Sequence, residues 1–217
     1  LANSYYKLGN DIDLTEYINN LETQSWEPIG NEVTPFIGNF DGNGYKISGL
    51  TINSTNDYVG LFGSNNGTIR NVVLENINVV GGKNIGGLVG YTTGKIEDVE
   101  VKSGIIKGTE NVGGLVGYFR AGNISNSSVA GEVEGNNKIG GLVGYIYAKD
   151  YDATKTLQSC YSTVNVTGIG NEIGGLIGYI EKKSINSSGD VARVYTNISN
   201  VYATGNVVSQ GNNVGGL

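Results

Sequence analysis

Apolar and polar residues alternate along most of this chain, in short runs that glycine, asparagine and serine interrupt. Representative runs are Asp98-Val99-Glu100-Val101 and Glu132-Val133-Glu134. Such alternation between turn residues is typical of β-strands, and no stretch shows the sustained period of about 3.6 residues that an amphipathic helix requires. The pattern therefore predicts an all-β protein built from many short strands.

One phrase, Gly-Gly-Leu-Val-Gly-Tyr with close variants, returns along the chain. Its leucines follow one another at separations of 27, 27, 27, 34 and 41 residues, and they are Leu61, Leu88, Leu115, Leu142, Leu176 and Leu217. A second anchor, such as Ile69-Arg70-Asn71, precedes the next leucine by 18 or 19 residues, so all variation in length falls in one connection. A catalytic motif is normally needed once, whereas a phrase repeated this often indicates architecture.

Each repeat is too small to bury its apolar face alone, so successive repeats must stack. We therefore predict a parallel β-helix (β-solenoid) with about 27 residues and roughly three strands per coil, in which coils rise by about 4.8 Å. In this fold the leucines point inward, the glycines occupy places where a Cβ would clash, and the tyrosines form a column. The residues assigned to this structural motif are Gly87, Leu88, Gly90, Tyr91, Gly114, Leu115, Gly117, Tyr118, Gly141, Leu142, Gly144, Tyr145, Gly175, Leu176, Gly178 and Tyr179.

A second column is predicted for the polar residue of the other anchor. It contains Asn71, Asp98, Asn126 and Asn200. Stacked side chains of this kind can form amide ladders, so we expect the column to satisfy buried polar groups of the turns.

The repeats do not cover the whole chain. Residues 1–56 depart from the period and are expected to form irregular N-terminal coils or a cap, because the terminal units of solenoids must shield the core. Residues 57–217 hold the repeats, which stop within the phrase at Gly215-Gly216-Leu217. We expect a single elongated domain, truncated at its C-terminus, from a larger protein.

The amino-acid composition limits the partners, metal sites and cofactors that this chain can have. The 14 basic and 20 acidic residues give a net charge of −6, which disfavours nucleic acid as a partner. No apolar stretch approaches the length needed to cross a bilayer, so no membrane insertion of this segment is expected. The single cysteine, Cys160, aligns with inward-facing positions and is expected to be a buried, inert thiol. With no histidine present, neither a metal site nor a cofactor is expected.

These residues carry a family resemblance. The Gly-Gly-Leu-Val-Gly-Tyr phrases, together with the preceding FIGNFDGNGYKISGLTI, resemble the GLUG-repeat region of bacterial secreted and cell-surface proteins, including immunoglobulin A1 protease-type metallopeptidases and adhesin-like proteins. The resemblance implies a right-handed parallel β-helix on an extracellular or cell-surface bacterial protein. Those metallopeptidases bind zinc through H-E-x-x-H, and this chain has no histidine. Any peptidase activity would therefore lie outside these 217 residues.

The variable connection is the most informative functional feature. Its extra residues fall at the same corner of two adjacent coils, and insertions of this kind map to one face of a solenoid, often the binding face. They would form a ridge of aromatic and charged side chains suited to a host protein or glycan. The residues of this predicted insertion ridge are Tyr147, Lys149, Asp150, Tyr151, Asp152, Lys182, Lys183, Asp190, Arg193 and Tyr195.

The sequence thus favours a non-catalytic spacer or adhesive module whose other partners are further solenoid repeats of the same chain. Two alternatives stay open: an accessory, substrate-positioning region of an immunoglobulin A1 protease-like zinc metallopeptidase, and a glycan-active β-helix lyase or hydrolase. The latter needs two opposed carboxylates, and no convergent acid and base set is evident. Asp41-Gly42-Asn43-Gly44 resembles half of a calcium loop but lacks the glutamate that would complete it, and we predict a turn there.

Overall fold

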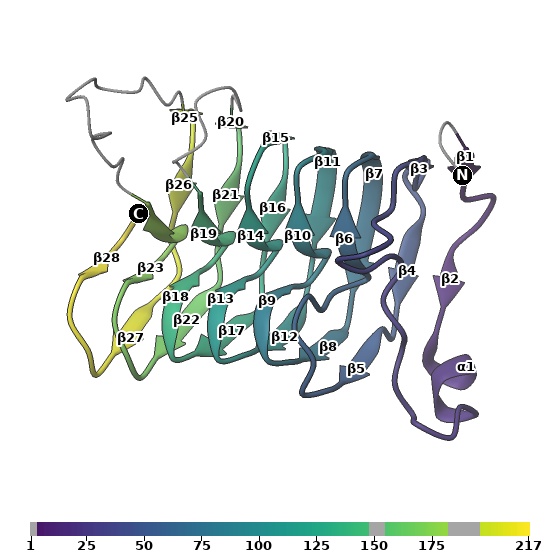
Figure 1. The fold of residues 1–217 in the computed structure, drawn as a ribbon, viewed down its shortest axis with the longest axis horizontal. Helices are drawn as coiled ribbons and strands as arrows, with labels where there is room; N and C mark the ends of the chain where they lie inside the picture. The colour runs from purple at the N-terminus through teal and green to yellow at the C-terminus, as the bar shows by residue number, and fades with distance from the viewer. Residues whose placement is uncertain (1–3, 148–154, 182–195) are drawn as a thin grey trace.

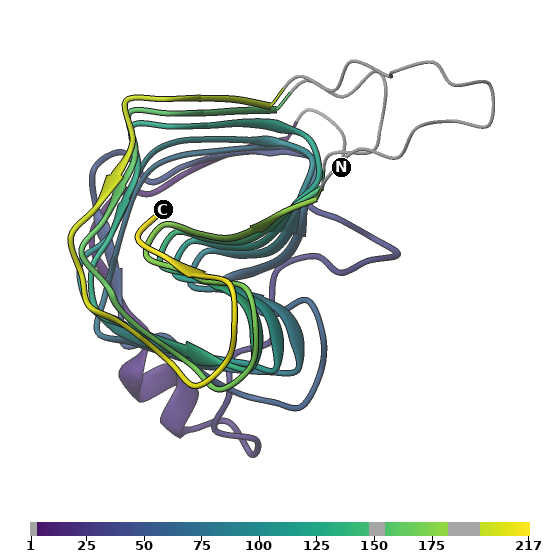
Figure 2. The same cartoon turned by 90° about the vertical axis from the view of Figure 1, so that its left-hand side faces the viewer.

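The chain folds into an elongated stack of coils, seen here in a computed structural model that describes residues 4–147, 155–181 and 196–217. The coils follow one another along the long axis from the N-terminal to the C-terminal end (Figure 1). Viewed along that axis they superpose almost strand on strand (Figure 2). All strand pairs are parallel, and the predicted parallel β-helix is confirmed.

The strands of the described residues form four sheets. Sheet A contains β1 (Tyr5–Lys7), β2 (Ile12–Asp13), β3 (Asn39–Asp41), β4 (Lys46–Ser48), β7 (Thr68–Glu75), β11 (Lys95–Val101), β15 (Gly122–Ser125), β16 (Ser128–Val129), β20 (Lys155–Gln158), β21 (Tyr161–Ser162), β25 (Thr196–Ser199) and β26 (Tyr202–Ala203). Sheet C contains β5 (Thr51–Asn53), β8 (Ile77–Val80), β12 (Gly104–Lys107), β17 (Glu132–Gly135), β22 (Asn165–Gly168) and β27 (Val207–Ser209).

The repeated phrase supplies the other two sheets. Sheet D contains β9 (Lys83–Gly86), β13 (Glu110–Gly113), β18 (Asn137–Gly140), β23 (Ile173–Gly174) and β28 (Val214–Gly215). Sheet B contains β6 (Phe62–Asn65), β10 (Val89–Thr92), β14 (Val116–Phe119), β19 (Val143–Ile146) and β24 (Ile177–Ile180). A full coil therefore passes through sheets A, C, D and B in turn, which corrects the expectation of roughly three strands per coil. The error arose because the glycine-rich phrase resembles one turn, whereas each half of it is a short strand.

The register follows the repeat. Val89 pairs with Val116 and Val116 with Val143, at separations of 27 residues, and Val143 pairs with Ile177 across the longer coil. The predicted period is confirmed. The extra residues of the longer coils lie between sheet B and sheet A, at 148–154 and 182–195, outside the described residues.

The core runs along the axis inside the coils. Leu88, Leu115, Leu142 and Leu176 are fully buried, and each is followed on sheet B by a buried valine or isoleucine. Aligned aliphatic side chains of this kind form one continuous hydrophobic cluster through the stack. Burial of this apolar surface is the main source of stability, as expected when no single coil has a core of its own.

The N-terminal segment belongs to the same stack. β1 pairs with β3 and β3 pairs with β7, so the first strands extend sheet A. The short helix α1 (Thr15–Asn19) lies at the N-terminal end, where Leu14 and Ile18 join the hydrophobic core (Figure 1).

The predicted polar column is present, but its role differs from the expectation. Asn71, Asp98, Asn126 and Asn200 all adopt positive φ, between 50° and 54°. The side chains of the last three are exposed, so they do not satisfy buried turn groups. Asn and Asp tolerate the left-handed conformation better than other non-glycine residues, and this backbone requirement explains the column.

Candidate functional site

A row of tyrosines runs along the outer side of sheet B. The predicted column pairs in register, Tyr91 with Tyr118, Tyr118 with Tyr145, and Tyr145 with Tyr179. Successive ring centroids are 5.1, 4.8 and 5.9 Å apart. Tyr58 extends the row toward the N-terminal end, with its ring 6.0 Å from that of Tyr91. We call these five residues the tyrosine row.

Glycine explains why the row lies where it does. Each coil is indented where sheet D meets sheet B, and the two limbs of this indentation lie against each other (Figure 2). A Cβ on Gly117 would lie 2.4 Å from Ile85 N, and one on Gly144 would lie 2.5 Å from Asn111 C. A Cβ on Gly178 would lie 2.5 Å from Ile139 N in sheet D, and one on Gly90 would lie 2.6 Å from Tyr58 C and 2.8 Å from Asn84 O. Only glycine permits such an approach, because any side chain would separate the two sheets.

The second glycine of each phrase meets the next coil instead. A Cβ on Gly87, Gly114, Gly141 or Gly175 would lie between 2.1 and 2.5 Å from a carbonyl oxygen one coil further along. None of these residues has a positive φ. The glycines of the phrase are thus required by close backbone approach and not by a left-handed turn.

A second left-handed column runs along and beside sheet D, next to the tyrosine row, and shares Tyr58 with it. It contains Tyr58, Asn84, Asn111, Lys138, Glu172 and Asn213, with φ between 54° and 66°. Asn111 Nδ2 donates to Asn84 Oδ1 at 2.7 Å, so the amide contact expected of the other column occurs in this one.

Charged side chains beside the tyrosine row are paired with one another. Lys138 Nζ lies 2.8 Å from Glu110 Oε1 and 5.3 Å from the ring centroid of Tyr145. The hydrogen bond from Lys138 lowers the pKa of Glu110, and burial raises the pKa of Tyr145, whose hydroxyl donates to Glu181. Tyr145 is therefore uncharged at neutral pH, and this part of the row is an aromatic surface with paired charges at its edge.

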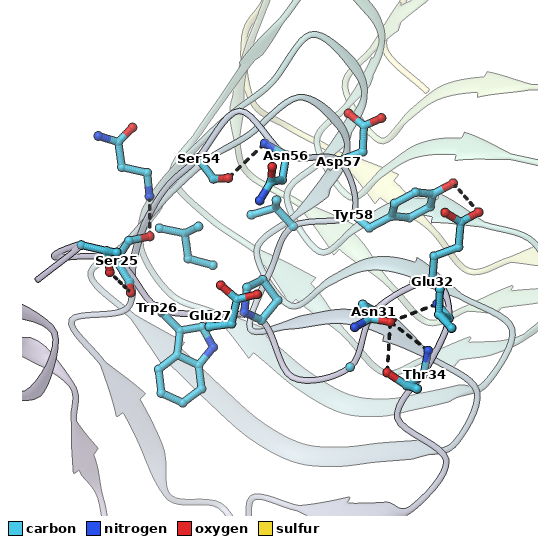
Figure 3. A pocket seen from close by; sticks show the side chains of 17 residues that line it. Ser25, Trp26, Glu27, Asn31, Glu32, Thr34, Ser54, Asn56, Asp57 and Tyr58 are labelled. Carbon is cyan, nitrogen blue, oxygen red and sulfur yellow. Dashed lines mark hydrogen bonds between the residues drawn. The ribbon is translucent and has the colours of Figure 1, made fainter. Parts of the chain in front are cut away.

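A large hollow lies toward the N-terminal end, with a volume of about 700 Å³. Residues 23–34 form one side of this groove and residues 52–59 form the other (Figure 3). Trp26 is fixed in the groove because its indole N–H donates to Leu61 O at 3.3 Å. Tyr58 OH lies 3.4 Å from Glu32 Oε1, which it reaches as a donor. We call this hollow the Trp26 groove.

Polar groups line the rest of the Trp26 groove. They are Thr23, Ser25, Glu27, Asn31, Glu32, Thr34, Asn53, Ser54, Asn56 and Asp57. Some of these are occupied locally, since Asn31 Oδ1 accepts from the backbone N–H groups of Val33 and Thr34, and Asp57 Oδ1 accepts from that of Lys83. No lysine or arginine is among the described residues that line it.

A smaller hollow of about 350 Å³ leads from the groove to the tyrosine row. It shares Glu32 and Tyr58 with the Trp26 groove and is also lined by Tyr91, Tyr118 and Arg120. Arg120 Nη1 lies 3.4 Å from Tyr91 OH. The two hollows thus adjoin at Glu32 and Tyr58, and their lining residues extend from Trp26 to Tyr118 on sheet B.

The predicted insertion ridge is only represented by one residue. Tyr147 lies beside the tyrosine row, with its ring 6.2 Å from that of Tyr118 and 5.6 Å from the Arg120 guanidinium. Lys149, Asp150, Tyr151, Asp152, Lys182, Lys183, Asp190, Arg193 and Tyr195 lie outside the described residues. The ridge therefore stays a prediction.

Asp41, at the start of the predicted turn, has structural surroundings. Asp41 is buried and accepts hydrogen bonds from Asn71, Tyr5, Asn43 N and Arg70, which together lower its pKa. The Asp41 side chain therefore has a structural role in stabilising this turn. Across the described residues, no group of three or more histidine, cysteine, aspartate or glutamate side chains is placed to hold a metal ion.

The comparisons with known proteins agree with this architecture. Residues 108–134 match the model of the GLUG motif, so the chain carries this motif within the third and fourth coils. The fold resembles the crystal structure of a "putative immunoglobulin A1 protease" from Bacteroides ovatus, with a TM-score of 0.61 and 18% identity over 98% of this chain and 77% of that one. At this identity the likeness shows the fold.

Two relatives share parts of the sequence. A "Putative Gly-rich membrane protein" of Evansella cellulosilytica is 45% identical over 73 residues, which are 32% of this chain. Halomucin of Haloquadratum walsbyi is 38% identical over 92 residues, which are 39% of this chain. The matches span 8% and 1% of the lengths of these two relatives. No helix among the described residues is both long and apolar enough to span a membrane.

Proposed function

We propose that this chain is a non-catalytic β-solenoid module of an exported bacterial surface or secreted protein, and that it holds adhesive groups at a fixed distance and orientation. The observation that carries the proposal is the unbroken parallel register from β5 to β27 over a continuous core. A stack of this kind has no internal hinge, since each coil is bonded to the next along all four sheets. The occurrence of similar segments within much longer relatives, one named a membrane protein, supports a modular role at a surface.

Rigidity has a direct test. Asn53 and Val208 occupy equivalent places in sheet C, five coil steps apart through successive register pairs. At about 4.8 Å per step, their Cα atoms should be about 24 Å apart. Spin labels on Asn53→Cys and Val208→Cys, in a Cys160→Ser background, should give one narrow distance distribution in native buffer. The same sample in denaturant is the matched control, and a broad native distribution would contradict the spacer function.

Adhesion through the insertion ridge has a separate test. A variant with residues 148–154 and 182–195 replaced by short Gly-Ser linkers should lose binding to host-cell glycans and proteins while it keeps the narrow spin-label distance. Unchanged binding would assign adhesion to another surface. Loss of the narrow distance would show that the insertions support the stack, contrary to the low cost expected of surface loops.

The resemblance to the Bacteroides ovatus structure favours a second candidate, an accessory region that positions substrate for a peptidase. The complete reading frame decides between the two. An H-E-x-x-H motif elsewhere in the parent protein would support the peptidase, whereas further repeats with a wall or membrane anchor would support the adhesive spacer.

A further inference from the structure

One residue of the Trp26 groove has an unfavourable backbone conformation. Tyr58 adopts a φ of 61°, in a column whose other members are three asparagines, one lysine and one glutamate, none of them aromatic. A bulky aromatic residue is disfavoured in the left-handed region, and such conformations cluster at functional sites. The fold accepts asparagine here, so a requirement other than backbone geometry favours the tyrosine ring.

That ring joins the two hollows. Tyr58 lines both the Trp26 groove and the smaller hollow, and its ring contacts the first ring of the tyrosine row on sheet B. The hydrogen bond to Glu32 fixes its hydroxyl group. Its replacement by asparagine would remove the aromatic ring that the two hollows share.

The chemistry of the groove limits the ligand. Aromatic faces bind the C–H faces of sugar rings, and carboxylates, amides and hydroxyls bind sugar hydroxyl groups. Glu27, Glu32 and Asp57 line the Trp26 groove with no basic side chain among its described residues, so an anionic ligand would be repelled. A volume of about 700 Å³ is that of a small-molecule or oligosaccharide site.

The spacing of the tyrosine row indicates the shape of the ligand. Coils repeat at about 4.8 Å, and the ring centroids of Tyr58, Tyr91 and Tyr118 follow one another at 6.0 and 5.1 Å. An extended glycan that enters the Trp26 groove and runs along the stack would therefore pass these three rings in succession.

We propose that the Trp26 groove and the adjoining tyrosine row bind a neutral, extended β-linked glycan chain. This site is formed by the first coils, apart from the insertions, and does not depend on the insertion ridge. Glu32 and Asp57 accept hydrogen bonds from sugar hydroxyl groups, and Trp26 and Tyr58 supply the apolar contact.

The test uses the only tryptophan of the chain. Because the sequence contains one Trp, fluorescence reports the groove alone. The intact chain is titrated with cellohexaose, xylohexaose, mannohexaose and chitohexaose, and calorimetry gives the affinity independently. A saturable change in Trp26 emission with at least one of these four is expected.

Two variants test whether the fluorescence change comes from binding at Tyr58. Tyr58→Asn should weaken binding at least tenfold, as loss of a central aromatic contact does, while its Tm stays at or above that of the wild type. Tyr202→Ala is the matched control, because Tyr202 is an exposed tyrosine on sheet A and should leave binding unchanged. The spin-label distance between residues 53 and 208 is measured in both variants, so a failure of the groove is distinguished from a failure of the spacer.

Three results would overturn the proposal. One is the absence of any signal from all four hexaoses at millimolar concentration, and another is wild-type affinity in Tyr58→Asn. The third is binding of hexalysine or of an oligogalacturonate in place of the neutral hexaoses, which would identify a cationic peptide or an acidic glycan as the ligand.

Discussion

Substitution of Gly117 tests whether close contact between sheets B and D maintains the fold. An alanine Cβ there would lie 2.4 Å from Ile85 N, 2.5 Å from Asn84 C and 2.8 Å from Gly90 O, whereas ordinary contacts begin at 3.4 Å. All three neighbours are backbone atoms, so relief requires a shift of about 1 Å between two hydrogen-bonded sheets. Overpacking of this kind costs about 1–3 kcal/mol, and the value here should lie at the upper end, because no flexible side chain can move away.

The reduced freedom of the unfolded chain offsets part of this loss, by about 0.4–1 kcal/mol for Gly→Ala. The net destabilisation is then about 2 kcal/mol, which for a chain of this size lowers Tm by about 4–8 °C. Calorimetry and circular dichroism measure it. Gly9→Ala is the control, because nothing lies within 4 Å of a Cβ on Gly9, and its Tm should not fall. If Gly117→Ala has the same Tm as Gly9→Ala, close backbone approach does not explain why glycine is required at position 117.

Four further outcomes are expected. Leu115→Ala, at a fully buried position, should lower the free energy of unfolding by about 2–5 kcal/mol, whereas deletion of residues 182–195 should leave Tm nearly unchanged. The folded pKa of Asp41 lies below its unfolded value, and the hydrogen bond from Asn71 is the largest cause. The stability that this carboxylate contributes is therefore complete above about pH 4 and is lost as pH falls toward the folded pKa. Asp41→Asn should accordingly flatten the acid limb of a plot of unfolding free energy against pH. Burial raises the pKa of the Cys160 thiol to about 11, so Ellman's reagent should modify it at pH 8 only after unfolding, and rapid native labelling would contradict its burial.

The solenoid could be predicted because its determinants repeat. The spacing of Leu88, Leu115 and Leu142 gives the coil length, and their apolar neighbours identify the core. The number of strands per coil was harder to predict, since Gly86 and Gly87 resemble a turn although Gly86 still belongs to β9. Glycine marks both sharp turns and close backbone approach, and only coordinates distinguish the two.

The Trp26 groove could not be predicted in the same way. Its two sides come from residues 23–34 and 52–59, which do not repeat and have no regular pattern that would place them together. One local signal was available. Tyr58 stands three residues before Leu61, whereas its equivalents Asn84 and Asn111 stand four residues before their leucines, because the first unit has one glycine where the later units have two.

Departures from the repeat are therefore the places to look for ligand specificity in this chain. Repeated residues such as Gly117 and Leu115 are fully used in closing the indentation and filling the core, so a match to the GLUG motif informs about the fold and not about a ligand. The coil that contains β6 differs at two positions that both line the smaller hollow. Ser64 pairs with Tyr91 where later coils have tyrosine, and Tyr58 takes the place of an asparagine. Ser64 leaves space where later coils have a tyrosine ring, and Tyr58 adds a ring beside that space. The aromatic row therefore ends in a groove.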